Sequence, residues 1–367
     1  MAISRDPQDK GAVLVTGVSG FLGSHVALAA LKSGFSVVGS VRRPNAAEHM
    51  TKALAEAGGD VQHLSFATLD LLSDEGWAEA AAHCDHMIHV ASPFVTLMPD
   101  DPDDLIRPAV EGTRRAIQAA LAAGHERIVL TSSMAAVHHG HDDENRVYGP
   151  SDWTQLDGPL VSAYAASKTL AEREAWRLAE QAGQRERLAV INPAAMLGPL
   201  LDADPGTSVA TLIPMLTGKM PMVPEITLEY VDVRDVAQAH IAALTSGDAG
   251  GQRHILAGPS LSLWEIAGIV REALPEYASK LPRRQMPGWF AFILRHFNKS
   301  LRDAAPFFGV RRRSDSGAGI ALIGHPLRSL RDTIVETVLS LDAQGLIPSV
   351  NAGDAALPAS LQKARHG

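Results

Sequence analysis

The sequence feature that most constrains the fold is a glycine-rich turn near the N-terminus. An apolar run, Ala12–Thr16, leads without a break into the residues TGVSGFLG at positions 16–23, and a helical pattern follows. Gly17 allows a tight turn, Gly20 lets the backbone approach an anion, and Gly23 lets the helix pack closely on the strand. The free N–H groups at a helix N-terminus also bind phosphate. This arrangement predicts a strand–turn–helix unit that binds the pyrophosphate of a dinucleotide.

Short apolar runs alternate with longer helical patterns over the first 195 residues. The expected strands are Ala12–Thr16, Phe35–Val41, Val61–Thr68, His86–Val90, Arg127–Ser132 and Leu188–Asn192. The expected helices are Gly23–Ser33, Ala46–Ala57, Leu105–Ala123 and Val161–Ala182. Strands that are apolar throughout are buried on both faces, as in a parallel sheet covered by helices. The alternation therefore predicts an α/β fold with a Rossmann-type doubly wound parallel sheet.

The pattern changes after Asn192-Pro193, where proline and glycine become frequent. Further along, Ser262 with Glu265 three residues later predicts the capped start of another helix. The expected organisation is a nucleotide-binding domain at residues 11–195 plus 228–260, a smaller, discontinuous C-terminal substrate-binding lobe at 196–227 plus 261–345, and flexible tails at 1–10 and 349–367.

The end of the second expected strand indicates which dinucleotide binds. A carboxylate at that point would bind the ribose 2′-hydroxyl of NAD. The sequence instead has Arg42 and Arg43. Because arginine binds phosphate through two hydrogen bonds, Arg42, with or without Arg43, predicts NADP(H), and a solvated basic loop is the alternative. Asp70 and Leu71 follow the third strand and are expected beside the adenine, with helix capping by Asp70 as an equal alternative.

Composition excludes several other classes of protein. The chain has 33 Lys and Arg residues against 41 Asp and Glu residues, a formal charge of −8, unlike the basic surface of a nucleic-acid-binding protein. No run approaches the length of a membrane span, and the N-terminus lacks the apolar core of a secretion signal. The single cysteine, Cys84, has no activating motif around it and suits a reducing compartment. We expect a cytoplasmic protein that binds neither nucleic acid nor membranes.

Two further motifs provide candidate catalytic side chains. Tyr164 and Lys168 are four residues apart in one helical pattern, so the phenol and the ammonium share a face. A neighbouring cation favours the phenolate and makes the tyrosine a usable proton donor and acceptor. Ser132 and Ser133 follow the fifth apolar run, at the carboxyl edge of the sheet, where folds of this kind bind ligands.

In combination these motifs resemble the short-chain dehydrogenase/reductase superfamily. The TGxxGxxG spacing and the chain length resemble its extended branch, part of the NAD-dependent epimerase/dehydratase superfamily. Within that branch, about residues 11–260 are similar to the group of dihydroflavonol reductases, cinnamoyl-CoA reductases and aldehyde/ketone reductases. The stretches that carry the resemblance are His89–Pro93, Pro108–Thr113, Thr131–Ser133, Asn192-Pro193 with Gly198-Pro199, and Val231–Ala237.

The resemblance implies a Ser–Tyr–Lys triad beside NADPH. Ser133 would hold the substrate carbonyl, with neighbouring Ser132 as its rival for that role. Tyr164 would deliver a proton to the carbonyl oxygen, and Lys168 would bind the nicotinamide ribose. Met196 departs from the small or β-branched residue usual for the family at that point. The implied cofactor contacts are Gly17, Gly20, Phe21, Leu22, Gly23, Arg42, Asp70, Leu71, Ala91, Tyr164, Lys168 and Pro193, with Ala194 beside them.

Two clusters of ionisable residues resemble other kinds of site: a metal site at 138–144 and a pair of catalytic carboxylates at 232–235. The run 138–144 begins with two histidines and resembles a metal-ligand cluster. No second cluster with ligand spacing accompanies it, so we expect a loop on the substrate side and no metal. Asp235 lies at the start of an expected helix and is interpreted as its cap, and Arg234 as a member of a buried ion pair.

The leading interpretation is an NADPH-dependent carbonyl reductase that converts an apolar or aromatic aldehyde or ketone to an alcohol. The alternatives are a nucleotide-sugar epimerase or dehydratase on the same fold, and a redox sensor that binds NADP without turnover. The Asp-Glu pair typical of dehydratases does not follow Ser133, and Tyr164 and Lys168, which sensors usually lose, are both present. Its partner would be a small carbonyl compound, and the resemblance implies a homodimer through the helices at 105–123 and 161–182.

Overall fold

The computed structural model describes residues 10–93, 99–143, 146–297, 301–302, 304 and 307–349. The expected tails therefore lie almost entirely outside the described residues. A seven-stranded parallel sheet forms the centre, with the order β11-β7-β5-β4-β1-β2-β3. Its strands are β1 (Ala12–Thr16), β2 (Ser36–Val41), β3 (Leu64–Thr68), β4 (His86–His89), β5 (Arg127–Thr131), β7 (Leu188–Pro193) and β11 (Arg253–Leu256).

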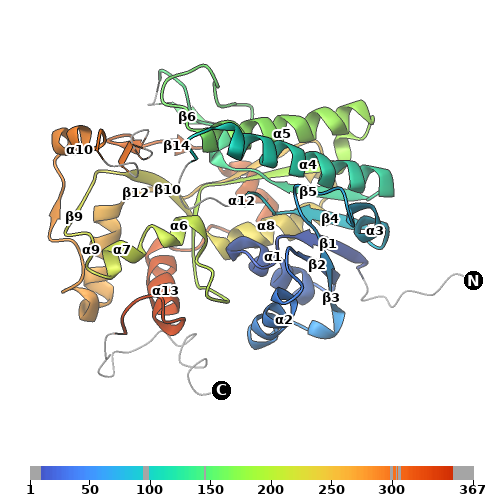
Figure 1. Ribbon diagram of the computed structural model, residues 1–367, viewed down its shortest axis with the longest axis horizontal. Coiled ribbons are helices and arrows are strands. Elements are labelled where there is room, and N and C mark those ends of the chain that lie inside the picture. Colours follow the sequence, from blue (N-terminus) through green and yellow to red (C-terminus); the bar gives the residue numbers. More distant parts are fainter. Residues whose placement is uncertain are drawn as a thin grey trace, which may run out of the picture.

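Helices cover both faces of this sheet (Figure 1). One face carries α3 (Trp77–Ala82), α4 (Asp103–Ala123) and α5 (Ala163–Gln181). The other carries α1 (Phe21–Lys32), α2 (Ala46–Glu56), α8 (Val233–Thr245) and α12 (Gly317–Ile323). Successive side chains of β1 point to opposite faces and are buried on both: Leu14 packs in the core beneath α4 and α5, and Val13 in the core on the other side. The doubly wound Rossmann-type sheet is confirmed.

Shorter elements gather beyond the carboxyl ends of the strands, on the left of Figure 1. A second sheet has the order β12-β10-β8, and two small parallel pairs, β13-β9 and β14-β6, lie outside it. These strands are β6 (Val147–Tyr148), β8 (Ala195–Leu197), β9 (Met222–Val223), β10 (Thr227–Asp232), β12 (Ser260–Ser262), β13 (Arg284–Gln285) and β14 (Arg313–Ser314). The helices here are α6 (Gly206–Ala210), α7 (Ile213–Leu216), α9 (Leu263–Ala273), α10 (Gly288–Leu294) and α13 (Leu330–Ala343).

Local sequence signals explain some of the helix and strand ends. At the start of α9, Glu265 N donates to the Ser262 hydroxyl and Ser262 N donates to the Glu265 carboxylate. These two hydrogen bonds form the predicted capping box. Residues 61–63, expected in the third strand, form a 3₁₀ turn instead, because the Asp60 carboxylate accepts a hydrogen bond from Gln62 N and tightens the chain there.

The interpretation of Asp235 as the cap of α8 is wrong. Strand β10 passes directly into the helix, so Asp232 takes the capping position and accepts from Arg234 N at 2.8 Å. Arg234 forms the expected ion pair, with its Nη2 2.6 Å from Asp232 Oδ2. Asp235 is buried and instead binds Arg328, 93 residues later in the chain.

Candidate active site

The glycine-rich turn has the geometry that its sequence predicts. Gly17 has a φ of 72°, in the left-handed region that favours glycine. A Cβ on Gly23 would lie 2.0 Å from the Gly17 carbonyl oxygen, so only glycine lets α1 pack this closely on the turn. Helix α1 begins at Phe21, directly after the turn, and presents its N-terminus to the space above the strands. Ser40 at the end of β2 fixes the turn by accepting a hydrogen bond from Gly17 N at 3.0 Å.

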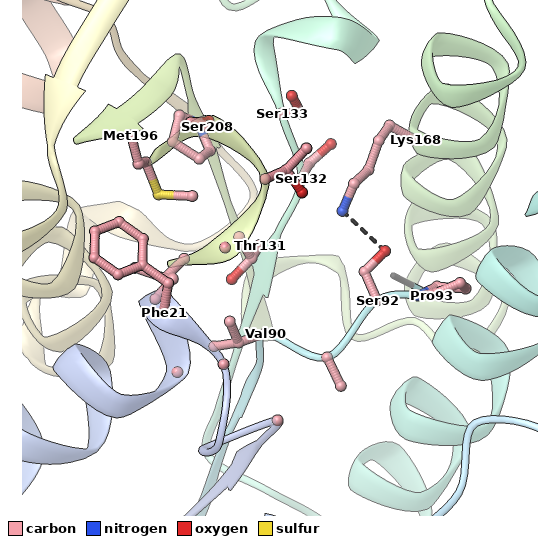
Figure 2. Close-up of a pocket in the computed structure, with 18 of the residues that line it drawn as sticks. Phe21, Val90, Ser92, Pro93, Thr131, Ser132, Ser133, Lys168, Met196 and Ser208 are labelled. Carbon is pink, nitrogen blue, oxygen red and sulfur yellow. Dashed lines mark hydrogen bonds between the residues drawn. The ribbon is translucent and has the colours of Figure 1, made fainter. Parts of the chain in front are cut away.

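A cleft of about 950 Å³ begins at this turn and follows the carboxyl edge of the sheet. Every predicted site residue except Asp70 lines it. Those residues are Gly17, Gly20, Phe21, Leu22, Gly23, Arg42, Leu71, Ala91, Ser133, Tyr164, Lys168 and Pro193, and Arg43, Ser132, Ala194 and Met196 lie on its wall as well. Predicted site residues as far apart in the chain as Gly17 and Pro193 are thus brought to one site. Figure 2 shows its central part.

Two basic side chains stand at the cofactor end of the cleft. Arg42 and Arg43 directly follow β2, and both are exposed. Among the residues that the structure describes, neither guanidinium forms an ion pair with a carboxylate. His49, on the first turns of α2, lines the same end. This end of the cleft therefore presents positive charge that is available to a phosphate.

Asp70 lies outside the cleft wall. Its Oδ1 accepts a hydrogen bond from Leu72 N at 2.8 Å, and its backbone carbonyl accepts one from the Trp77 indole at 3.1 Å. The carboxylate thus closes a local turn and caps no helix, and its contact with adenine stays a prediction. Leu71 is the residue of this pair that the cleft reaches.

Helix α5 carries two of the candidate catalytic groups. Ser162 caps the helix by accepting from Ala165 N at 3.1 Å, which places Tyr164 in the first turn and Lys168 one turn later. The Lys168 ammonium lies 6.0 Å from the centre of the Tyr164 ring and donates to the Ser92 hydroxyl at 3.1 Å (Figure 2). Tyr164 is 38% exposed, so its phenol is accessible from the cleft.

The two serines after β5 have different partners. Ser132 is buried and donates its hydroxyl proton to Glu172 Oε2 at 2.5 Å. The Ser133 hydroxyl accepts a hydrogen bond from Ala135 N at 3.1 Å, an arrangement that leaves its own proton available. Both serines line the cleft, opposite Lys168 in Figure 2. Of the two, Ser133 has the hydroxyl that is able to donate to a ligand.

The far end of the cleft combines apolar walls with buried polar groups. Met196 and Phe307 contribute apolar surface there. Burial lowers the pKa of His139 to about 3 and lowers the pKa of His138 well below its usual value, so both imidazoles are neutral at pH 7. Burial also raises the pKa of the Glu229 carboxyl. The sequence predicts a loop on the substrate side for these histidines, which agrees with their place on the cleft wall, although no periodicity identified them individually.

Other wall residues were missed for a similar reason. Ser92 follows β4 and reaches Lys168, and Ser208 comes from α6, beside Met196 and above Phe21 in Figure 2. Ser92 lies in the stretch His89–Pro93 that carries the family resemblance, at the carboxyl end of a strand, where ligand contacts are common. Ser208 belongs to no motif. In the described ranges, no group of three or more His, Cys, Asp or Glu residues is placed to hold a metal ion. None of the described helices has the length and apolar character needed to cross a membrane.

Comparison with known proteins gives consistent matches along most of the chain. The model of the NAD dependent epimerase/dehydratase family matches residues 13–258. Cinnamoyl-CoA reductase 2 of Arabidopsis thaliana is 31% identical over 339 residues, which cover 92% of this chain and 94% of that protein. Dihydroflavonol 4-reductase of Zea mays is 31% identical over 288 residues, 76% of this chain and 78% of that protein.

A solved structure extends the match to the fold. The crystal structure of yeast methylglyoxal/isovaleraldehyde reductase Gre2, complexed with NADPH, superposes with a TM-score of 0.74 at 26% identity, and the match covers 92% of this chain and 100% of that one. These relatives confirm the expected extended short-chain dehydrogenase/reductase group and an oxidoreductase as the class of enzyme. The chain belongs to the NAD dependent epimerase/dehydratase family.

Proposed function

We propose that the chain is an NADPH-dependent carbonyl reductase that reduces an aldehyde or ketone to an alcohol through Ser133, Tyr164 and Lys168. The observation that carries this proposal is that one cleft is lined by these three side chains, the glycine-rich turn and Arg42. A hydride donor bound along the sheet edge and a protein proton donor can then act on the same carbonyl group.

NADPH is the cofactor, as the sequence predicts and as the NADPH complex of the yeast relative supports. The residues of this chain fit the group. Because Gly23 has no side chain, the N-terminus of α1 can lie close to the turn, where a pyrophosphate can bind. The exposed guanidinium groups of Arg42 and Arg43 can bind a 2′-phosphate. When bound, NADPH supplies the hydride.

The proton chemistry is assigned to the side chains of β5 and α5. The Ser133 hydroxyl, whose proton is available, holds the substrate carbonyl oxygen by donating to it. Tyr164 donates its phenolic proton to the same oxygen as negative charge develops there. The Lys168 ammonium, one helical turn away, stabilises the phenolate that remains. Its hydrogen bond to Ser92 holds the ammonium at the edge of the cleft.

The walls at the far end support an apolar or aromatic substrate. Met134, Met196, Leu228 and Phe307 provide surface that an apolar group can cover. Met196 and Phe307 belong to the segments 196–227 and 261–345, so we assign substrate binding to this lobe and cofactor binding to residues 11–195 plus 228–260. No observation on the structure favours a sugar-nucleotide substrate.

The experiment that tests the proposal follows NADPH oxidation with a panel of aromatic and aliphatic aldehydes and ketones. We expect oxidation with NADPH in preference to NADH. In Tyr164→Phe, kcat should fall by about 10²- to 10⁴-fold while the Kd of NADPH changes by less than about twofold. Tyr277→Phe is the matched control, because that phenol binds Asp342 rather than lining the cleft. Full activity in Tyr164→Phe would contradict the mechanism, and conversion of sugar nucleotides alone would contradict the substrate class.

A further inference from the structure

A buried ion pair lies directly behind the candidate catalytic groups. Glu172 is on α5, one helical turn after Lys168, and Arg253 is the first residue of β11. Their side chains are 0% and 7% exposed. Arg253 Nε lies 2.6 Å from Oε1 of the carboxylate, and Nη2 lies 3.2 Å from Oε2, so the pair is bidentate. The triad itself includes neither residue.

The carboxylate of Glu172 also accepts hydrogen bonds from three uncharged side chains. Oε2 accepts from the Ser132 hydroxyl at 2.5 Å and from Asn192 Nδ2 at 2.9 Å, and Oε1 accepts from the Trp176 indole at 3.2 Å. With the two hydrogen bonds from Arg253 included, each oxygen of the carboxylate accepts at least two hydrogen bonds. One carboxylate therefore joins α5 to the ends of β5 and β7.

The guanidinium of Arg253 extends this network to the segments around the cleft. It donates to the backbone carbonyls of Pro150 at 2.8 Å and Asp152, and at 3.4 Å to that of Ala136 in the turn after Ser133. It also stacks 4.0 Å from the centre of the Trp153 ring. The segment on the C-terminal side of the serines is thereby held from a second direction.

These contacts determine which serine hydroxyl keeps a proton available for a ligand. The chain is extended at Ser133, with φ −165° and ψ 157°, so neighbouring side chains point in opposite directions. Glu172 binds the hydroxyl of Ser132 on one side, and Asn192, which Glu172 also binds, donates to the backbone carbonyl of Ser133 at 3.3 Å. Figure 2 shows the two serines side by side across from Lys168.

We propose that Glu172 and Arg253 form a positioning pair that holds Ser133 in register with Tyr164 and Lys168. The pair touches neither substrate nor cofactor; it acts by tying the end of β5 to the helix that carries the other two groups. Removing one partner of a buried pair leaves the other charge uncompensated, so the local geometry must change. This inference rests on the proposed function, in which Ser133 is catalytic.

The test combines Glu172→Gln with Ser133→Ala. A displacement of about 1 Å can cost about 10²-fold in rate, so we expect kcat of Glu172→Gln to fall by about 30- to 100-fold. The Kd of NADPH should change by less than about twofold. In the Ser133→Ala background, the same substitution should lower kcat by less than about threefold, because the group that it positions is already absent.

The matched control is Asp235→Asn, which breaks another buried pair, with Arg328, on the far side of the sheet. It should lower the midpoint of thermal unfolding and leave kcat unchanged. If Glu172→Gln does not fold, Ser132→Ala removes a single donor and should show the same dependence on Ser133 with a smaller loss.

The outcomes separate the two proposals. Equal losses of kcat from Glu172→Gln, or from Ser132→Ala in its place, with and without Ser133 would overturn the positioning role while leaving the triad intact. Wild-type activity in Ser133→Ala alone would overturn the proposed function, and the positioning role with it. A loss of kcat in Asp235→Asn as large as that in Glu172→Gln would show that lost stability alone explains the effect, and would also overturn the positioning role.

Discussion

Four buried histidines make the folded protein sensitive to mild acid. His25, His89, His139 and His240 are each no more than 5% exposed. Burial lowers the pKa of His25 and of His240 to about 4, and the pKa of His89 and of His139 to about 3. In the unfolded chain each imidazole titrates near pH 6.5. The folded state therefore holds four neutral imidazoles at a pH where the unfolded state has begun to protonate them.

The sign and size of the effect follow from this difference in proton uptake. The stabilisation from the lowered pKa values is fully present above pH 6.5 and is lost as the pH falls toward 4, because only the unfolded chain gains protons there. At pH 5 the loss is about 2 kcal/mol for each histidine and about 8 kcal/mol for the four. A loss of this size is comparable to the whole stability of an ordinary protein, about 5–15 kcal/mol. We expect unfolding to become complete between pH 6 and pH 4.

His240 shows why a proton is costly in the folded state. Its Nδ1 donates to the carbonyl oxygen of Val236 at 2.8 Å, so its Nε2 is the acceptor for the Thr131 hydroxyl at 2.7 Å. A second proton would have to replace that acceptor without access to water. His240→Gln removes the titration, so the free energy of unfolding should depend less steeply on pH, by about 1.2 kcal/mol per pH unit between pH 6 and pH 5.

Urea unfolding followed by tryptophan fluorescence between pH 5 and pH 8 measures these slopes. His63→Gln is the control, because that side chain is 61% exposed beside Asp60 and makes no buried contact. Its slope should equal that of the wild type. A free energy of unfolding that stays constant from pH 8 to pH 5 would refute the argument, and so would an unchanged slope in His240→Gln.

Three further predictions concern the cofactor end and the cysteine. Arg42→Ala should raise the KM for NADPH by about 10- to 100-fold, the value of a charge-assisted hydrogen bond, and leave the KM for NADH nearly unchanged; equal effects would remove the 2′-phosphate argument. Gly23→Ala should weaken NADPH binding by more than about tenfold in a fluorescence titration, because the new methyl group would lie 2.0 Å from the Gly17 carbonyl oxygen. Cys84→Ser should keep wild-type kcat, and iodoacetamide should not inactivate the enzyme at pH 8, because burial raises the pKa of the Cys84 thiol to about 12.

The cofactor half of the cleft was predictable because its signals are local. The residues TGVSGFLG at positions 16–23 predict a turn, an approach to phosphate and a helix contact within eight positions, and the structure shows the turn and the helix contact. The β1 run is apolar on both alternating faces, which is enough to predict a buried parallel strand. Such features need no knowledge of residues far along the chain.

The pairing of buried carboxylates was less predictable, because it depends on where elements end and on residues far along the chain. The sequence analysis chose Asp235 as the cap of α8, and the structure has Asp232 there, because β10 ends at that residue. The Asp235 carboxylate pairs instead with Arg328, 93 positions later in the chain. No local pattern encodes which of two nearby carboxylates meets a distant guanidinium.

The choice between Ser132 and Ser133 shows the same dependence at the reacting centre. Both serines line the cleft, so in the proposed mechanism the choice of the catalytic serine depends on which hydroxyl is already bound by the protein. Glu172 binds the hydroxyl of Ser132, and Arg253, 81 positions from Glu172, neutralises its buried charge. On this proposal the reacting serine is selected by a carboxylate that does not line the cleft. The two serines alone therefore could not reveal the choice, which follows from the carboxylate that binds one of them.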